Sequence, residues 1–423
     1  MSPAHQNTNA DAQPPIAVIG AGIVGICCAM YLQQAGQQVV LFDPEEPGSG
    51  ASSGNAGLIV QGACSPEASQ AGAREVLNML LDPLGALTIR PSHLPRMIPW
   101  FLHFLAASRP HRIPKTAAAM YALNRHAVSS FAPLIKQAKA AEWFKLRPRI
   151  DLFESPESLA GSALKQSLLK EFGVSFQVLN GEEMRELEPG LAIPMAGGLI
   201  YSEDAYSPDP YQLARKLVVA FLAHGGQLVR EKVRGFEFSE AGVGAIRTTA
   251  GKHPVAGVVV AAGAYSVPLA KQLGCKVSLQ GERGYHTMLP NPGVEVKNSL
   301  LSQDRHFAIT PMKDGLRLAG TAEFAKLDAP PNYARADKLV QNAQQILGPL
   351  NTQDATQWMG TRPATPDSLP IISPTPHKNA FLAFGHGHLG LTGAAITGQL
   401  IAQLVTNQPT ATDTTPYHAD RFR

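Results

Sequence analysis

The chain has 423 residues, which is enough for two to three domains of about 150 residues each. Hydrophobic residues make up 44% and charged residues 16%, so the composition is that of a globular protein and excludes collagen, a disulfide scaffold and a disordered chain. The formal net charge is only +3, and the basic residues are scattered along the chain, which argues against nucleic-acid binding.

The four cysteines, Cys27, Cys28, Cys64 and Cys275, form neither a CxxC metal motif nor a disulfide framework. This usage is typical of a reducing compartment, so we expect a cytoplasmic protein without a metal site. No segment offers the roughly 18 continuous apolar residues that a membrane span needs, and the apolar run 16–32 is interrupted by glycines. We therefore expect no integral membrane segment.

The fold is predicted to begin at Ile16, after a polar stretch, 1–15, that we interpret as a disordered leader. Apolar residues 16–19 and 39–42 predict two buried strands, and residues 21–35 predict a helix between them. This order is typical of a βαβ unit in a parallel sheet.

The turn of this unit carries the motif Gly20-Ala21-Gly22-Ile23-Val24-Gly25, which is GxGxxG. The first glycine permits a tight turn, the second lets a pyrophosphate approach the backbone, and the third lets helix and strand pack closely. Asp43 ends the second predicted strand, where a carboxylate can accept the ribose hydroxyls of an adenine dinucleotide. The motif predicts dinucleotide binding and leaves both NAD and FAD open.

The rest of the chain mixes segments of helical and strand character. An apolar, aromatic stretch at 98–105, with Arg90, Arg96 and Arg109 nearby, allows two interpretations: a helix packed inside the protein, or an amphipathic surface that touches a membrane. The further expected elements are a mainly helical region at 73–140, a strand at 198–201, a helix at 211–223, a strand at 258–263, strands within 282–324, and a last helix from 390 to about 404.

The start of the chain, in which Ala29, Leu32, Gly36, Val39 and Asp43 continue the glycine motif, resembles the FAD-binding start of the D-amino-acid oxidase and dehydrogenase superfamily. The bacterial D-amino-acid dehydrogenases are the most similar branch. The acid is more often Glu in that family, so Asp43 shortens the reach of the carboxylate without changing its role. Further motifs in the family's order carry the resemblance along almost the whole chain, at 50–57, 283–285, 358–367 and 385–392.

The resemblance implies a Rossmann-type FAD-binding domain interleaved with an α+β substrate-binding domain built on an antiparallel sheet. It implies FAD rather than NAD, and non-covalent binding, because no cysteine follows Cys275, whereas some relatives attach the flavin through a late cysteine. The expected FAD-binding segments are 16–72, 206–274 and 354–410, and the expected substrate-binding segments are 73–205 and 275–353.

The cofactor contacts implied by the resemblance lie in the glycine motif, the acid, the small-residue loop at 50–57, the adenine end and the late glycine loop. Small residues suit a close approach of the backbone to the cofactor. These contacts are Gly20, Gly22, Ile23, Val24, Gly25, Asp43, Ser52, Ser53, Asn55, Ala56, Gly57, Val233, Ala262, Gly263, Gly387, Gly390 and Thr392.

Three residues are expected at the substrate: Arg362, Tyr285 and His386. The planar guanidinium of Arg362 matches a carboxylate in a bidentate manner, and the Tyr285 hydroxyl can add to the same carboxylate. His386 and His388 follow or flank glycines, so they are either acid-base groups or residues that form the wall of the substrate site.

The implied activity is oxidation of a D-amino acid, or of a cyclic D-imino acid such as D-hydroxyproline, by hydride transfer from Cα to flavin N5. A quinone or another carrier would take the electrons, with peripheral contact at the cytoplasmic face of the inner membrane. Two alternatives stay open, an oxygen-dependent sarcosine or glycine oxidase and a non-catalytic flavin-binding subunit. An NAD-dependent dehydrogenase would leave the loops 52–57 and 385–392 without a role.

Overall fold

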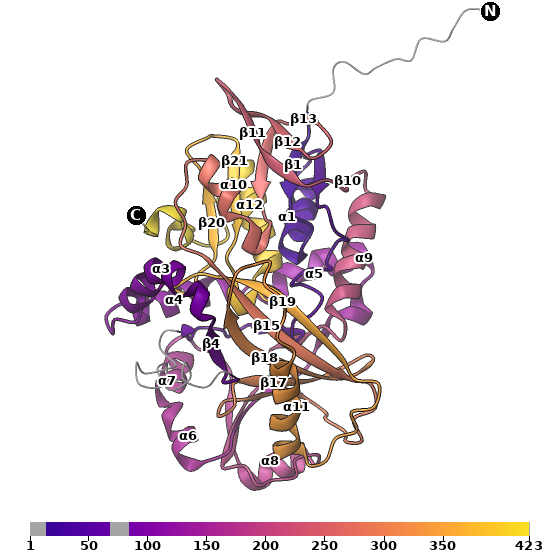
Figure 1. Cartoon of the computed structure of the whole chain (residues 1–423), viewed down its shortest axis with the longest axis vertical. Coiled ribbons are helices and arrows are strands. Elements are labelled where there is room, and N and C mark those ends of the chain that lie inside the picture. The colour runs from indigo at the N-terminus through magenta and orange to yellow at the C-terminus, as the bar shows by residue number, and fades with distance from the viewer. Residues whose placement is uncertain (1–13, 68–83, 423) are drawn as a thin grey trace, which may run out of the picture.

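The computed structural model describes residues 14–67 and 84–422, and these are organised around two main sheets (Figure 1). The expected leader at 1–15 therefore lies outside the described residues, apart from Pro14 and Pro15. The parallel sheet occupies the upper half of Figure 1, and the larger sheet lies below it. The predicted fold class is confirmed.

The first sheet has the order β10-β2-β1-β14-β21-β20, and every neighbouring pair is parallel except β20 with β21. The four central strands are fully buried apolar runs, as expected for a sheet covered on both faces, whereas the edge strands β10 and β20 each contain an exposed residue. The strands are β1 (Ile16–Ile19), β2 (Val39–Phe42), β10 (Gln227–Val229), β14 (Gly257–Val260), β20 (Ile371–Pro374) and β21 (Ala380–Phe384).

Alternate side chains of these strands enter two different cores. Ile16 and Val18 of β1 pack with the helices on one face, whereas Ala17 and Ile19 pack toward a small sheet and a short helix on the other. The first face carries α1 (Ile23–Gln34), α4 (Ile113–Asn124), α5 (Ala127–Ala138), α9 (Pro210–Ala223) and α12 (Ala394–Val405); the second carries β11 (Val233–Ser239), β12 (Gly242–Thr248), β13 (Lys252–Pro254) and α10 (Val267–Gln272).

The second sheet is nine-stranded and mostly antiparallel, with the order β19-β15-β18-β17-β16-β6-β8-β7 and with β4 added beside β18. Met184 of α8 and Leu339 and Ile346 of α11 pack in the core on one of its faces. The elements are β4 (Leu87–Ile89), β6 (Arg149–Phe153), β7 (Gln177–Asn180), β8 (Gly197–Tyr201), β15 (Gln280–Leu289), β16 (Ser299–Ser302), β17 (Phe307–Met312), β18 (Gly315–Phe324), β19 (Thr356–Ala364), α8 (Gly181–Leu187) and α11 (Ala334–Leu347).

Smaller elements complete the fold. Helix α3 contains Pro99, and α5 contains Pro133, so the prolines of this region lie within helices as well as between them. These elements are α3 (Leu94–Ala107), α6 (Pro156–Gly161), α7 (Ala163–Glu171) and the short sheet of β3 (Leu58–Ile59), β5 (Lys145–Leu146) and β9 (Ala205–Tyr206). Within the described part of the chain, no helix is both long and apolar enough to cross a bilayer.

Two observations bear on the expected boundaries. Strand β19 lies in the antiparallel sheet although it belongs to the segment 354–410, and α4 and α5 pack on the parallel sheet although they belong to 73–205. The last helix begins at Ala394 rather than at 390, because the chain first makes a 3-10 turn at Gly387–Leu389. The sheet that a segment joins, and the residue at which a helix begins, are set by tertiary contacts that a local sequence pattern does not reveal.

Helices α1 and α12 cross closely because glycine occupies position 398. A Cβ at Gly398 would lie 2.6 Å from the backbone carbonyl carbon of Cys27. We expect Gly398→Ala to destabilise the protein by about 1–3 kcal/mol through overpacking. Gly161→Ala is the matched control, because its Cβ would meet nothing within 4 Å. Thermal unfolding checks this, and equal midpoints for the two variants would contradict it.

Candidate active site

A cavity of about 1720 Å³ extends from the carboxyl ends of β1, β2 and β14 to one end of the antiparallel sheet. Sites for a small ligand commonly measure about 300–1,000 Å³, so this cavity has room for a dinucleotide together with a substrate. Its position follows the rule for open α/β sheets, in which ligands bind beyond the carboxyl ends of the strands.

The glycine motif forms the turn from β1 to α1. Gly20 has φ of +109°, and a Cβ there would lie 2.5 Å from the Ala261 carbonyl oxygen. A Cβ at Gly25 would lie 1.9 Å from the Gly20 carbonyl oxygen, so the third glycine allows helix and strand to pack together. Gly22 precedes α1, lines the cavity and has no side chain of its own to cap the helix. A helix N-terminus at a cavity is suited to a pyrophosphate.

Asp43 lies at the end of β2 and lines the same part of the cavity. Its Oδ2 accepts a hydrogen bond of 2.7 Å from the Ala21 N–H. The expected adenine contacts Val233, Ala262 and Gly263 line the cavity as well. The glycine turn, the acid and these residues together fit the adenosine and pyrophosphate of FAD.

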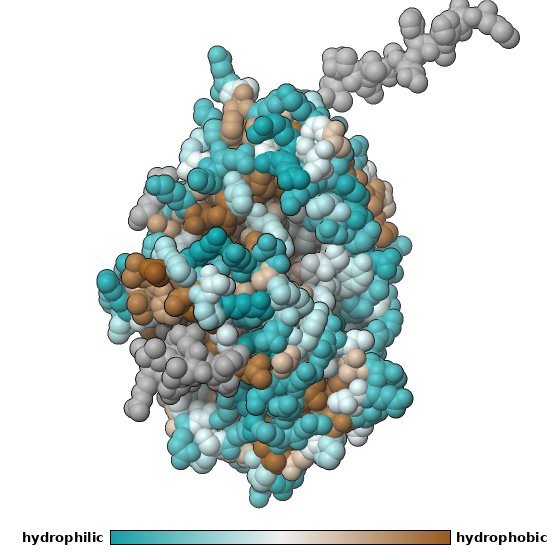
Figure 2. All heavy atoms as spheres, viewed as in Figure 1, coloured by the Kyte–Doolittle hydropathy of each residue, from teal (hydrophilic) through white to brown (hydrophobic). Residues whose placement is uncertain are grey.

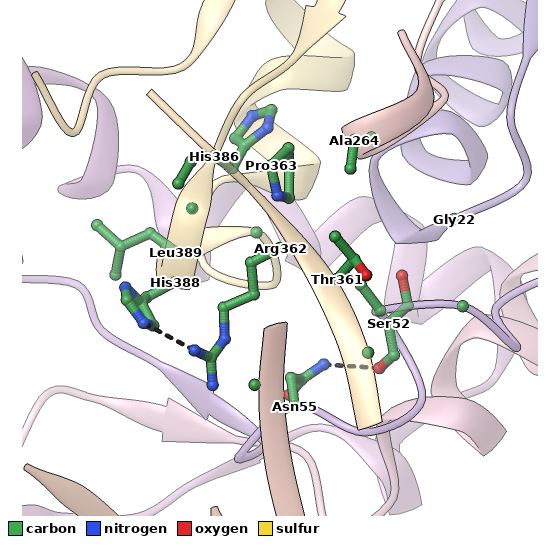
Figure 3. A pocket seen from close by; sticks show the side chains of 18 of the residues that line it. Gly22, Ser52, Asn55, Ala264, Thr361, Arg362, Pro363, His386, His388 and Leu389 are labelled. Atoms are coloured by element: carbon green, nitrogen blue, oxygen red, sulfur yellow. Dashed lines mark hydrogen bonds between the residues drawn. The ribbon is translucent and has the colours of Figure 1, made fainter. Parts of the chain in front are cut away.

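The loop at 50–57 continues the cavity toward the second sheet. Asn55 Nδ2 donates to the Ser52 carbonyl oxygen at 2.6 Å, as Figure 3 shows, and Asn55 Oδ1 accepts from the Gly57 N–H at 2.7 Å. Ser52 Oγ accepts from the Ile23 N–H at 2.9 Å, which ties the loop to α1. The small residues of this loop therefore form one wall of the cavity.

Two side chains that the sequence did not single out hold this loop from the antiparallel sheet. Arg317 Nη1 on β18 donates to the carbonyl oxygens of Ser53 and Asn55 at 3.1 and 2.7 Å. His286 Nδ1 on β15 lies 2.9 Å from the Gly54 carbonyl oxygen. Burial lowers the pKa of His286 to about 4 and that of Arg317 to about 10, so His286 is neutral and Arg317 is cationic at neutral pH.

The late glycine loop lines the cavity through Gly387, Gly390 and Thr392. Thr392 Oγ1 accepts from the Val60 N–H at 3.1 Å, which joins this loop to the chain that follows the small-residue loop. His386 also lines the cavity, but its Nε2 lies 2.8 Å from Thr397 Oγ1 on α12. Burial lowers the pKa of His386 to about 4, so it is neutral and its contact with α12 positions the loop.

Arg362 on β19 stands opposite Glu282 on β15. Its Nη1 donates to Glu282 Oε1 at 2.6 Å and to the Thr321 carbonyl oxygen at 2.9 Å. The guanidinium lies over Gly284, where a Cβ would come within 2.1 Å of Nη2. Among the described residues, Nε and Nη2 have no hydrogen-bond partner, and the side chain is 21% exposed. Arg362 is therefore anchored on one side and free to bind an anion on the other.

His388 lies beside Arg362 on the cavity wall (Figure 3). Its Nδ1 is 2.5 Å from Glu67 Oε1, and its Nε2 is 2.9 Å from Glu282 Oε1 and 3.1 Å from Arg362 Nη1. Burial lowers the pKa of His388, but attraction to the two carboxylates outweighs this and raises the pKa to about 10. His388 is then a cation at neutral pH and donates to both carboxylates.

Glu282 itself is buried beneath Arg362 and His388, with a side chain only 3% exposed. Burial raises its pKa, but the two cations lower it further, so the pKa lies well below its usual value. Potential metal-ligand atoms of Glu67, Glu282 and His388 lie within 4.8 Å of one another. Both imidazole nitrogens already contact carboxylates, so the arrangement is that of an ion-pair cluster.

The ring of Tyr285 lines the cavity, but its hydroxyl already has two protein partners. It donates to Glu323 Oε2 at 2.6 Å and accepts from the Asn332 N–H at 3.0 Å. Three of the expected cofactor residues, Gly25, Ser53 and Gly57, do not line the cavity, and they shape the turns that do. The other expected cofactor and substrate residues are brought together around the cavity.

Comparison with known proteins identifies the family. Residues 15–404 match the model of the FAD dependent oxidoreductase family known as DAO. The chain is 35% identical over 415 residues to a D-amino-acid oxidase of Bradyrhizobium diazoefficiens, covering 96% of this chain and 98% of that protein. It is 30% identical over 419 residues to a D-amino acid dehydrogenase of Rhizorhabdus wittichii, covering 96% and 100%. The chain therefore belongs to the DAO family of FAD-dependent oxidoreductases.

The fold agrees with this assignment. A glycine oxidase from Geobacillus kaustophilus superposes with a TM-score of 0.74 at 22% sequence identity, covering 96% of this chain and 98% of that one. The resemblance stated from the sequence is thus confirmed. FAD is the cofactor that this family implies, and the cavity fits it.

The charge of Glu282 should control the protonation of His388. In Glu282→Gln the larger of the two attractions is lost, so the pKa of His388 should fall from about 10, and the cation should disappear at a lower pH than in the wild type. An NMR titration of the imidazole resonances, with His388→Asn to assign the signal, measures this. Glu67→Gln should cause a smaller fall. An unchanged pKa in Glu282→Gln would contradict the prediction.

Proposed function

We propose that the protein oxidises a D-amino acid, or a cyclic D-imino acid such as D-hydroxyproline, at the bond between Cα and nitrogen. The observation that carries this proposal is the guanidinium of Arg362, whose Nη1 is fixed by Glu282 while Nε and Nη2 remain available at the cavity. A fork of this geometry is suited to a carboxylate. The names of the two relatives compared above support an amino acid as the molecule to which this carboxylate belongs.

The protein's contribution to the reaction is orientation. FAD, when bound, supplies the hydride acceptor. Arg362 fixes the substrate carboxylate, and the loop at 50–57 is held against the same sheet by Arg317, so Cα is presented to the flavin in a defined geometry. Neither histidine is a suitable base, because His386 is bonded to Thr397 and His388 is protonated. The substrate amine therefore has to enter unprotonated.

FAD is proposed to bind non-covalently. Cys27, Cys28 and Cys275 are buried in the cores beside the parallel sheet. Cys64 lines the cavity, but burial raises the pKa of its thiol to about 11, so it is not the thiolate that a covalent attachment needs. The cofactor contacts of the glycine motif, the loop at 50–57 and the late glycine loop would hold FAD by hydrogen bonds and packing.

Reduction of the bound flavin by substrate tests the proposal. Without oxygen, one D-amino or D-imino acid from a panel that also contains sarcosine and glycine should bleach the flavin band at about 450 nm. Arg362→Lys should lower kcat/KM by about 100-fold, mainly through KM, because lysine cannot reproduce the bidentate contact. Arg421→Lys is the control, because Arg421 pairs with Asp367 and does not line the cavity.

The panel also separates the alternatives. Bleaching only by sarcosine or glycine would replace the proposal with the amine-oxidase alternative, and a yellow protein that none of these compounds bleaches would favour a non-catalytic flavin-binding subunit. Repeating the reaction in air with and without a quinone identifies the acceptor. We propose a quinone, while the name of the oxidase relative favours oxygen as the second candidate.

A membrane surface is the proposed source of the quinone, and helix α3 is the proposed contact. Trp100 faces inward, stacks with Phe104 and donates its indole N–H to the Ala364 carbonyl oxygen. The outward face carries a row of exposed apolar side chains, visible in Figure 2 where Figure 1 places α3. This row is Leu94, Ile98, Leu102 and Leu105, at 52–62% exposure.

Charge near this row favours an anionic membrane. Arg96, Arg109, Arg112 and Lys115 are exposed on α3, α4 and the turn between them, and no acidic residue occurs between positions 84 and 141. Basic residues beside an exposed apolar helix face are typical of a helix that lies in the plane of a membrane surface. The supporting observations are thus an apolar row and a uniform positive charge.

Vesicle binding tests the membrane contact. The double variant Ile98→Ser and Leu102→Ser should lower binding to vesicles with anionic lipid by at least about tenfold, because two side chains worth ~1.5–3 kcal/mol each when buried are lost. Val219→Ser with Leu222→Ser is the control, since these side chains are exposed on α9. Equal cosedimentation of the two double variants with the vesicles would contradict the proposal.

A further inference from the structure

Arg317 on β18 is a buried cation that forms no ion pair with any described residue. It is 8% exposed, and its Nε has no hydrogen-bond partner. Burial lowers its pKa more than attraction to Asp209 raises it, yet the pKa of about 10 leaves it charged at neutral pH. Arg149 is buried as well, but it pairs with two carboxylates. An unpaired buried charge is costly, so we expect it to serve a ligand rather than the fold.

The charge of Arg317 stands behind the loop at 50–57. Its Nη1 donates to the carbonyl oxygens of Ser53 and Asn55, and the Nδ1 of His286 contacts the carbonyl oxygen of Gly54 between them. Arg317 and His286 share one face of the sheet, because Arg317 pairs with the residue two positions beyond His286 on β15. Three successive carbonyls of the loop therefore point toward the antiparallel sheet.

The N–H groups of the same three peptides point the other way. In a trans peptide the C=O and N–H bonds are directed oppositely, and the described chain has no cis peptide. These N–H groups belong to Gly54, Asn55 and Ala56, which line the cavity, and none of them has a hydrogen-bond partner among the described residues. Successive free N–H groups in a turn form a concave site for negative charge.

The course of the loop indicates which end of FAD these N–H groups face. Ser52 Oγ accepts from the Ile23 N–H at the start of α1, beside the expected pyrophosphate position. Gly54 packs against the ring of Trp358, since a Cβ there would lie 2.2 Å from it. Trp358 lies on the same face of β19 as Arg362, four residues further on. The loop thus passes from the pyrophosphate end toward the substrate end, where the flavin ring has to lie.

Reduction of the flavin increases its negative charge. A hydride brings two electrons and one proton, so the flavin that accepts it gains one negative charge. We propose that Arg317 is a positioning residue for flavin reduction, whose charge and whose hold on the loop carbonyls stabilise the negative charge of the reduced flavin. The inference rests on the proposed function of the cavity as a redox site.

The reduction potential of the bound flavin tests this role. It is measured on the FAD-loaded proteins by equilibration with redox dyes while dithionite reduces the flavin. Arg317→Gln removes the charge and keeps an amide donor, whereas Arg317→Lys keeps the charge. Arg305→Gln is the control, because Arg305 pairs with Glu154 and does not line the cavity.

Arg317→Gln should lower the equilibrium constant for reduction about tenfold, which is ~30 mV for two electrons, because a nearby positive charge is lost. Arg317→Lys should stay within about threefold of the wild type, and Arg305→Gln should be unchanged. An unchanged potential in Arg317→Gln would overturn the proposal, as would an equal fall in the Gln and Lys variants. A weaker hold on FAD at an unchanged potential would overturn it too, because the loop would then act on the pyrophosphate.

A second measurement needs only the wild type and decides the matter if Arg317→Gln does not fold. The reduced flavin should remain an anion below the pH at which free reduced flavin takes up a proton, because a neighbouring cation favours the charged form. Absorbance spectra of the reduced protein across a pH series show this, and protonation at the pH of free flavin would contradict the proposal. Dithionite needs no amino acid, so both measurements stand even if no amino acid reduces the flavin and the proposed oxidation fails.

Discussion

The pairing of β19 with β15 is the contact on which the site depends. It places Arg362 opposite Glu282 within one antiparallel ladder. At its end, β19 reaches the late glycine loop through a bridge between Ala364 and His386, so the same strand connects the antiparallel sheet with the chain that enters α12. Arg362, the proposed carboxylate-binding residue, is thus fixed relative to the parallel sheet that would hold the cofactor, and this alignment is what the proposed hydride transfer requires.

The antiparallel sheet also holds the cofactor side of the cavity. Arg317 and His286, on the neighbouring strands β18 and β15, bind carbonyl oxygens of the loop at 50–57. The same strands supply the two groups that accept hydrogen bonds from Arg362 Nη1, which are the carboxylate of Glu282 and the carbonyl oxygen of Thr321. Because one pair of strands positions both the flavin loop and the guanidinium, a shift of the sheet moves both together and preserves their relative orientation.

The cost of this arrangement is concentrated at a few buried groups. Removing Glu282 from water is unfavourable, and a buried ion pair is weak evidence for a stabilising role. Thr321 adds backbone strain and an unpartnered hydroxyl. The extensive apolar cores on both faces of the parallel sheet, together with the core under α11, provide the stability that tolerates such groups. Polar groups kept at such a cost are expected where they serve binding rather than folding.

The sequence by itself determined the family, the glycine turn, Asp43, the small-residue loop, the late glycine loop and Arg362, because each depends on local backbone freedom or on one side chain in a recognisable motif. It did not reveal Glu282, Arg317, His286 or Thr321, nor that the last helix starts at Ala394. Their roles depend on strand register, on a bulge and on contacts between residues up to 264 positions apart. It was also the tertiary structure that decided which face of α3 is exposed and that the Tyr285 hydroxyl is already bonded. Register and packing partners are set by the whole fold, and no local pattern encodes them.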